Sequence, residues 1–157
     1  MSKAESVERV SLTMRLFMAR AVLYQDAVAR WAGLNSTDLQ CVGLLSLNGP
    51  ATPGELAEWS GLTAGGAITA VIDRLEKQGI VSRDRDPQDR RRVIISVDYE
   101  ALGQRVGTVY QRTGERWGDY LSTLTVEQID FANELFAKAA EFNGDEIERL
   151  RSEPRLT

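Results

Sequence analysis

The residues of this chain best suited to specific chemistry are arginines, because Arg90, Arg91 and Arg92 stand side by side after a turn signal. Guanidinium groups bind phosphates through paired hydrogen bonds, and they enter narrow minor grooves of DNA, where the negative potential is deepest. Arg85 precedes them, and Arg74 lies farther upstream. The alternative is a solvated turn held by ion pairs, but adjacent arginines repel each other without an anionic partner. The cluster therefore favours contact with nucleic-acid phosphates.

A second set of candidate contact residues lies upstream, where a helix is predicted from about Thr63 to Gln78. After Thr63, its outward face carries the small residues Gly65, Gly66, Ala67, Thr69 and Ala70. Two glycines near a helix start cost up to about 1 kcal/mol each against alanine. We therefore expect them to let the helix N-terminus approach a phosphate closely, where free N–H groups can donate hydrogen bonds. Neutral drift on an adequate helix is the alternative.

The side chains that most enzymes need are scarce. The chain contains no histidine and one cysteine, Cys41, so it lacks the commonest general base and metal ligand and cannot form an internal disulfide. It also has no phosphate-binding loop and no nucleophile–base pair. We therefore predict a protein that is not an enzyme and that uses neither a metal nor a cofactor. Cys41 lies among apolar residues, which favours a core role over a redox role.

Length and charge are those of an ordinary globular protein. The 157 residues suffice for one domain and its core, and the net charge is −4. The charge is uneven, because residues 73–97 hold seven basic and five acidic side chains, whereas residues 98–157 hold seven and twelve. No apolar run approaches the roughly 20 residues needed to cross a bilayer, and the first residues lack the apolar core of a signal peptide. We therefore expect a cytoplasmic protein.

Hydrophobic periodicity and turn signals predict helices, one hairpin, and helices again. The predicted helices cover about 4–32, 36–47, 52–61, 63–78, 98–123 and 125–142, and the predicted strands cover 80–85 and 92–97. We expect Ser36 or Thr37 to open the second helix. Capping boxes are expected at Thr52 and Thr125, each with a Glu or Gln three residues later. The charged tail from Asn143 is expected to be partly frayed.

The first predicted helix is long and carries a continuous apolar stripe. Its apolar residues recur at alternating steps of three and four: Val7, Val10, Met14, Phe17, Ala21, Tyr24, Val28 and Trp31. Such a stripe packs along another helix. A helix of roughly 29 residues spans about 43 Å, which is more than a domain of this size needs. We therefore expect a dimerisation role, with coverage of the protein's own core as the alternative.

Two short helices joined by a glycine turn and followed at once by a basic hairpin form a winged helix-turn-helix. In this respect residues of about 34–97 resemble the MarR (multiple antibiotic resistance regulator) family of bacterial transcription factors. The resemblance rests on four stretches: Gly54-Glu55-Leu56-Ala57, Gly61-Leu62-Thr63, Ile72 to Gly79, and Asp86 to Val93. The flanking helices match more in layout than in sequence. The chain departs from the family at Ala70, where an arginine is common.

The resemblance implies a homodimer held by the N- and C-terminal helices, with a recognition helix in the major groove of double-stranded DNA and a wing in the adjacent minor groove. It also implies that Asp73 pairs with Arg91 and so fixes the angle of the wing. Many family members respond to small, often aromatic, ligands bound between two lobes. The candidate residues for such an effector pocket are Tyr24, Trp31, Tyr110 and Trp117. Core and interface roles are the alternative for these aromatic residues.

Taken together, the sequence predicts a mainly α protein with a small β-hairpin, in one domain spanning 1–157. A winged helix-turn-helix at 34–97 is flanked by dimerisation helices at 4–32 and 98–142. The expected function is a ligand-responsive repressor that binds a pseudo-palindromic operator as a homodimer, with half-sites about one helical turn apart. The alternative is a protein-interaction module without specific DNA binding, which the small-residue helix and the net acidity motivate.

Overall fold

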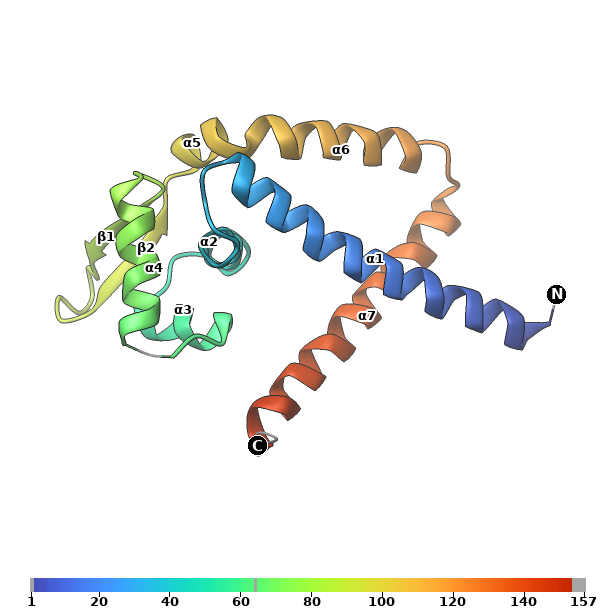
Figure 1. The fold of residues 1–157 in the computed structure, drawn as a ribbon, viewed down its shortest axis with the longest axis horizontal. Helices are drawn as coiled ribbons and strands as arrows, with labels where there is room; N and C mark the ends of the chain where they lie inside the picture. The colour runs from blue at the N-terminus through green and yellow to red at the C-terminus, as the bar shows by residue number, and fades with distance from the viewer. Residues whose placement is uncertain (1, 64, 154–157) are drawn as a thin grey trace. The chain divides into compact units, whose positions relative to one another are not determined.

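A computed structural model describes residues 2–63 and 65–153 of the chain, and its elements follow the predicted order (Figure 1). The helical elements are α1 (Lys3–Trp31), α2 (Ser36–Asn48), α3 (Pro53–Ser60), α4 (Gly66–Lys77), α5 (Tyr99–Leu102), the π-helical turn η1 (Gly103–Gly107), α6 (Thr108–Leu121) and α7 (Val126–Ser152). Strands β1 (Val81–Arg85) and β2 (Val93–Val97) pair antiparallel, with Val81 opposite Val97. The predicted fold class is confirmed.

Side-chain caps fix where several helices begin. The predicted capping boxes at Thr52 and Thr125 are both formed, and Ser2 forms another at the start of α1. Helix α2 begins at Ser36, as predicted, but the residue before it supplies the side-chain cap. Asn35 caps this helix by accepting a hydrogen bond from the Asp38 amide at 2.8 Å. Ser36 is already helical and donates its hydroxyl to another residue, so it is not free to cap the helix.

Helix α4 is shorter than predicted at its start. It begins at Gly66 because Gly65 has φ +114°, a conformation that cannot belong to a right-handed helix. Its end lies close to the predicted Gln78. Gly79 has φ +71°, and the amide of Ile80 donates to the carbonyl of Leu75 at 2.9 Å, which closes the helix in a Schellman arrangement.

The helical stretch predicted from residue 98 to about 123 is confirmed in extent but is not a uniform α-helix. The turn η1 interrupts it, so one wider π turn separates α5 from α6. The tail prediction was wrong, because α7 continues to Ser152 rather than fraying from Asn143. Ion pairs one helical turn apart support this last part, including Arg149 with Glu153 at 2.9 Å and Arg151 with Glu148 at 2.6 Å.

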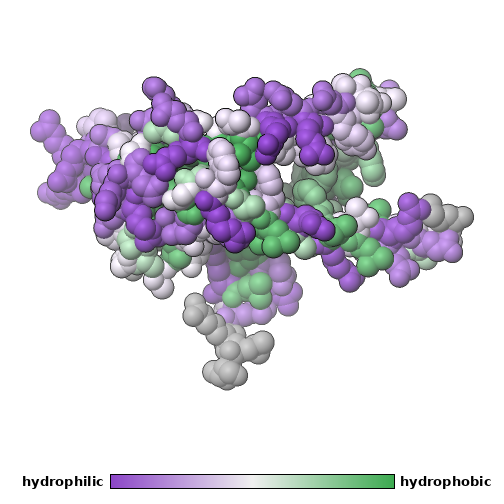
Figure 2. All heavy atoms as spheres, turned by 45° about the horizontal axis from the view of Figure 1, so that its top comes forward, coloured by the Kyte–Doolittle hydropathy of each residue, from purple (hydrophilic) through white to green (hydrophobic). Residues whose placement is uncertain are grey.

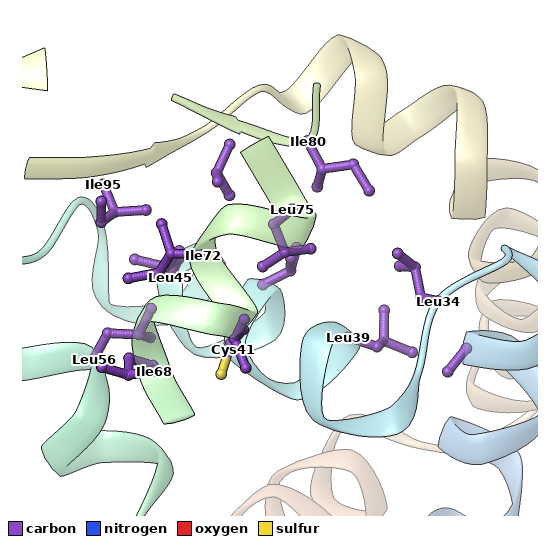
Figure 3. Packing of buried hydrophobic residues seen from close by; sticks show 14 of the residues in the cluster. Leu34, Leu39, Cys41, Leu45, Leu56, Ile68, Ile72, Leu75, Ile80 and Ile95 are labelled. Carbon is purple, nitrogen blue, oxygen red and sulfur yellow. The ribbon is translucent and has the colours of Figure 1, made fainter. Parts of the chain in front are cut away.

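The buried core lies among α2, α3, α4 and the hairpin, with the end of α1 added to it (Figure 3). Leu45, Leu56, Leu75, Ile80 and Ile95 are each at most 1% exposed. Each of these elements contributes an apolar face to this cluster, which holds α4 and the hairpin in place. The carbonyl and amide of Ala51 also bond to Ile95, and these bonds tie the α2–α3 loop to β2.

Contacts along the chain define two compact units, Met1–Tyr110 and Gln111–Thr157. The core lies in the first unit, and no residue of α7 is buried within the described chain. Large apolar side chains are exposed along both long helices, among them Val10, Leu16 and Leu23 on α1, and Phe131 and Phe142 on α7. On the face drawn in Figure 2, hydrophilic side chains cover much of the region that carries α4 and the hairpin.

Within the part of the chain that the structure describes, no helix combines the length and the hydrophobicity that crossing a lipid bilayer requires.

Candidate nucleic-acid interface

Helices α3 and α4 meet at a tight turn made possible by two small residues. Ala57 on α3 is 2% exposed, and its small side chain lets the two helices cross closely. Gly61 ends α3 in the left-handed conformation, with φ +69°, which a residue with a side chain rarely adopts. The turn presents α4 as the second helix of a helix-turn-helix, as the sequence predicted.

One face of α4 is packed into the core and the other faces solvent. The buried face is formed by Ile68, Val71, Ile72 and Leu75. The residues predicted to face outward are all exposed: Gly65, Gly66, Ala67, Thr69 and Ala70. Thr63 is also exposed, but it precedes the helix. Among the described residues no side chain caps the N-terminus of α4, whose N-cap residue is Gly65. A ligand could therefore approach the first backbone amides of α4 without displacing a capping side chain.

Arg74, predicted to flank the DNA contacts, is bound within the protein. Its Nε and Nη2 atoms donate to the two carboxylate oxygens of Asp38 on α2 at 3.0 and 2.6 Å. The Asp38 side chain is 2% exposed and that of Arg74 is 45% exposed. Hydrogen bonding to Asp38 raises the pKa of the Arg74 guanidinium, so this group stays charged at neutral pH. The contact fixes α4 against α2, which makes Arg74 a positioning residue in this structure.

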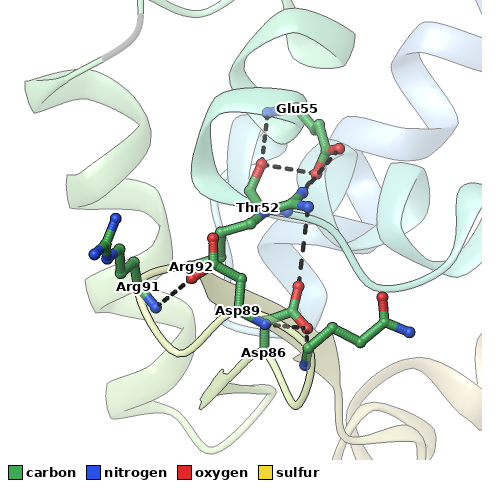
Figure 4. Close-up of polar contacts among 7 residues, drawn as sticks. Thr52, Glu55, Asp86, Asp89, Arg91 and Arg92 are labelled. Atoms are coloured by element: carbon green, nitrogen blue, oxygen red, sulfur yellow. Dashed lines mark hydrogen bonds and ion pairs between the residues drawn. The ribbon is translucent and has the colours of Figure 1, made fainter.

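The wing, defined here as residues 86–92 between the strands, is held by its own polar groups (Figure 4). Asp86 accepts hydrogen bonds from the amides of Gln88 and Asp89 at 2.8 and 3.4 Å. Arg92 lies between two carboxylates, with Nη2 3.6 Å from Glu55 Oε1 and Nη1 3.9 Å from Asp86 Oδ2. Because Glu55 belongs to the capping box of α3, Arg92 connects the wing to the helix-turn-helix.

The arginines of the wing region divide into two groups. Arg85 donates from Nη1 to the carbonyl of Arg90 at 3.1 Å, and Arg92 is paired as above, so both stabilise the wing. The side chains of Arg90 and Arg91 are exposed, and they make no hydrogen bond or ion pair with the described residues. In Figure 4 the Arg91 guanidinium points away from the wing carboxylates. These two cations are available to an external anion.

The structure gives Asp73 a different partner from the one expected. Its carboxylate pairs with Arg83 on β1, and Glu76 pairs with the same guanidinium. Hydrogen bonding to Asp73 raises the pKa of Arg83. Asp73 and Arg91 are therefore not brought together here. Arg83 takes the anchoring role because its strand follows α4 directly and packs against it.

Two residues of this interface were missed by the sequence reasoning. The role of Asp38 could not be predicted, because its partner Arg74 is 36 positions away and no local sequence pattern indicates such a pair. Arg83 carried a readable signal, because it lies two positions before Arg85 on one predicted strand and shares its face. Its distance in sequence from Asp73 gave no reason to connect the two.

A cavity of about 900 Å³ opens in the first unit, away from the wing. Its walls come from the second half of α1, from α2, and from the stretch α5–η1–α6. Most of its wall is apolar, including Val22, Leu39, Leu102 and Val106. Its size suits a small organic molecule, since such sites commonly enclose about 300–1,000 Å³.

The four aromatic residues predicted for an effector site are not gathered there. Tyr110 lines the cavity, and Tyr24 meets its ring edge-on with centroids 6.3 Å apart. Trp31 is 62% exposed near the end of α1 and does not line the cavity. Trp117 belongs to the second unit, where its ring meets that of Tyr120 edge-on, with the ring centroids 6.2 Å apart.

Cys41 lies in the core with 0% exposure, close enough to Asp38 and Arg74 to interact with them electrostatically. Burial raises the pKa of the Cys41 thiol, and the nearby carboxylate of Asp38 adds to the effect. The thiol is therefore protonated and shielded at neutral pH, as expected of a packing residue.

A helix-turn-helix followed directly by a wing with free arginines defines the class of winged-helix transcription regulators. Comparison with known proteins agrees with this class. A sequence model described as the MarR family matches residues 34–93. The chain is 36% identical to YcgE, an HTH-type transcriptional regulator of Bacillus subtilis (strain 168), over 150 residues that cover 96% of each protein. It is 24% identical to the regulator MhqR of the same organism over 68% of this chain and 72% of MhqR.

Solved structures share the fold. YusO from Bacillus subtilis matches with a TM-score of 0.60 and 23% identity, over 90% of this chain and 99% of YusO. A point mutant of MepR from S. aureus, solved bound to an oligodeoxyribonucleotide, matches with a TM-score of 0.56 and 17% identity, over 84% of this chain and 96% of MepR. The chain belongs to the MarR family of transcription regulators.

Proposed function

We propose that this protein is a repressor that binds a pseudo-palindromic operator in double-stranded DNA as a homodimer. In this proposal α4 enters the major groove and the wing reaches the adjacent minor groove. One observation carries it: Arg90 and Arg91 are exposed on the wing with no partner among the described residues. Every other arginine of the interface is bound to a carboxylate or a carbonyl.

The exposed face of α4 supports a close approach of backbone to DNA. Its small side chains leave its first amides accessible, and the N-terminal end of a helix favours a phosphate. Thr69 is the one exposed residue of that small face that carries a hydroxyl group for a base edge. Sequence preference would then depend largely on groove shape, read by Arg90 and Arg91 in a narrow minor groove.

The homodimer is supported by apolar side chains that the single chain leaves in solvent. Val10, Leu16 and Phe17 on α1 and Phe131 and Phe142 on α7 are between 45% and 67% exposed. Monomeric proteins rarely expose so many large apolar side chains, because covering them is strongly favourable. A second copy that covers these helices would give the assembly two wings.

Regulation by a small effector is supported by the cavity between α1, α2 and the α5–η1–α6 stretch. Leu102 and Val106 of its wall lie directly after the hairpin in the chain. An occupant that shifts these residues would change how the winged helix is held and so weaken operator binding. The effector site is therefore proposed at this cavity, with Tyr110 as its aromatic wall.

The experiment that tests DNA binding selects bound fragments from random duplex DNA and then compares variants on the selected site. The double variant R90A/R91A should weaken binding at least tenfold and flatten its salt dependence, because fewer counterions are released. The matched control R112A/R116A removes two charges from exposed positions on α6 and should retain affinity.

Equal loss in both double variants would indicate a general charge effect and would contradict wing-specific contact. Absence of any selected sequence, together with no binding in dilute salt, would favour the alternative of a protein-interaction module.

A further inference from the structure

The charge of the cavity wall restricts what it can bind. Among the described residues that line it, Asp26 is the one charged side chain, and neither lysine nor arginine is present. The Asp26 carboxylate is already occupied. Its Oδ1 accepts a hydrogen bond from Ser36 Oγ at 2.6 Å, and its Oδ2 lies 2.5 Å from Arg30 Nη1. A bound anion would meet this carboxylate and would find no free cation in the described wall.

The backbone offers no compensation for an anion. Ser36 opens α2, so the positive end of that helix dipole lies beside the cavity. That end already faces Asp26, through the hydrogen bond from Ser36. A cationic ligand would compete with the Arg30 guanidinium for the Asp26 carboxylate, and the rest of the wall is mostly apolar. Moving either charge from water into this wall is therefore unfavourable.

A neutral polar pair, contributed by α1 and α6, also lines the cavity. Tyr110 donates its hydroxyl to Gln25 Oε1 at 3.0 Å, and both residues line the cavity. Burial raises the pKa of Tyr110, so the phenol stays neutral at physiological pH. This bond leaves the Gln25 amide nitrogen as a donor and the Tyr110 oxygen as an acceptor. The pair can recognise a neutral group such as a carbonyl or an amide.

We propose that this cavity binds an uncharged, largely apolar molecule carrying a neutral hydrogen-bond acceptor, and that it discriminates against carboxylates. The inference deepens the proposed function, since it names the chemical class of the effector for the same site. Binding at the cavity does not itself depend on whether the protein binds DNA, so the two ideas can be tested separately.

Three probes with one ring system and three charges test the proposal: 2-naphthamide, 2-naphthoate and protonated 2-naphthylmethylamine. Their affinities for the full-length protein are measured by isothermal titration calorimetry at neutral pH. The amide should bind, and each charged probe should bind at least tenfold more weakly. Binding of either charged probe as tightly as the amide, or no binding of the amide, would overturn the proposal.

A blocking variant ties the signal to this cavity. Gly43 lines it, and a Cβ at this position would meet no atom within 4 Å. Gly43→Leu should therefore place a side chain in the cavity and obstruct part of it, and leucine also has the higher helix propensity. The variant should unfold at the wild-type temperature or above it and lose binding of the amide at least tenfold. Unchanged binding in this variant would place the probe elsewhere and overturn the proposal.

A second variant examines the polar pair. Gln25→Leu keeps the volume of the side chain close to that of glutamine but removes the amide donor. Gln25→Leu should weaken binding of the amide several-fold. An affinity equal to that of the wild type would contradict the role of this pair.

Operator binding is measured in a separate experiment. Addition of 2-naphthamide should weaken operator binding by the wild-type protein but not by the Gly43→Leu variant. If the probe binds but the protein does not bind DNA, the proposed function is contradicted and the proposed ligand class is not.

Discussion

The arginines of the interface have two roles. Those that face a carboxylate stabilise the protein, and those without such a partner are available to an external anion. Arg74, Arg83 and Arg92 face Asp38, Asp73 and Glu55, so their charge stabilises the interface. Arg90 and Arg91 have no described partner, so their charge is available to DNA phosphates. The three paired arginines face carboxylates on neighbouring elements, whereas Arg90 and Arg91 belong to the wing between the strands.

Arg74 should therefore matter more for folding than for contact with DNA. Arg74→Ala leaves the carboxylate of Asp38 buried without its partner, and we expect a loss of about 1–3 kcal/mol in the free energy of unfolding. Urea denaturation monitored by circular dichroism measures it. The double variant D38L/R74L removes both charges and should recover much of the loss. Wild-type stability of Arg74→Ala would show that the pair contributes little.

The capping box of α3 gives a pH-dependent prediction. Hydrogen bonds from Thr52 lower the pKa of Glu55 from its ordinary value of 4.5. A lowered pKa in the folded state means that the stabilisation is present above 4.5 and is lost as the pH falls through the lowered pKa. Thr52→Ala should cost about 1 kcal/mol at neutral pH, and the difference from wild type should shrink below pH 4.5.

Thermal unfolding of both proteins between about pH 7 and pH 3 measures this dependence, because the contributions of carboxylates common to both proteins cancel in the difference. Thr52→Ser keeps the hydroxyl and should behave as the wild type. A difference that stays constant across this whole range would rule out Glu55 as its source.

At the scale of elements, backbone conformation determines how the winged helix meets its neighbours. Gly65 sets the start of α4 through its positive φ, and Gly61 sets the angle between α3 and α4. The π turn η1 gives one wider helical turn, in which Val106 packs into the core and Arg105 donates to the carbonyl of Ala32 at 3.2 Å. Such turns often mark functional positions in helices.

Substitutions at the two glycines that begin α4 should distinguish an effect on stability from an effect on DNA binding. Gly65→Ala places a side chain at φ +114°, so we expect it to destabilise the protein by roughly 1–2 kcal/mol. Gly66→Ala starts the helix with a residue of higher propensity, and its Cβ meets no atom within 4 Å, so stability should hold or rise.

If close approach to a phosphate matters, Gly66→Ala should still weaken operator binding, because its methyl group faces the DNA. Chemical denaturation and fluorescence anisotropy with the selected operator give the two readouts. Unchanged affinity of this stable variant would refute close approach and leave neutral drift as the explanation.

At the scale of the whole molecule, the exposed apolar residues of α1 and α7 indicate a surface that a binding partner buries. No residue of α7 is buried in the described chain, although this helix carries several large apolar side chains. A helix of this composition gains little stability from its own hydrogen bonds and is usually held by packing on one face. A second copy of the chain is the cover that we propose.

The purified protein should therefore be a dimer at micromolar concentration in sedimentation velocity. Phe131 is 67% exposed, and Phe131→Glu should raise the dimer dissociation constant about 10- to 100-fold if its ring is buried on association. Asn133→Glu adds the same carboxylate to another exposed position of α7 and serves as control. A wild-type monomer at this concentration would contradict the proposed dimer.

The order of elements, the two predicted capping boxes, the turn at Gly61 and the outward face of α4 could be read from the sequence, because each depends on residues a few positions apart. Tertiary structure alone decided which arginines are paired, since the Asp38–Arg74 contact spans 36 positions and local rules do not reach that far. It also decided that Tyr110, rather than Trp31, lines the cavity, because a cavity is a property of how helices pack.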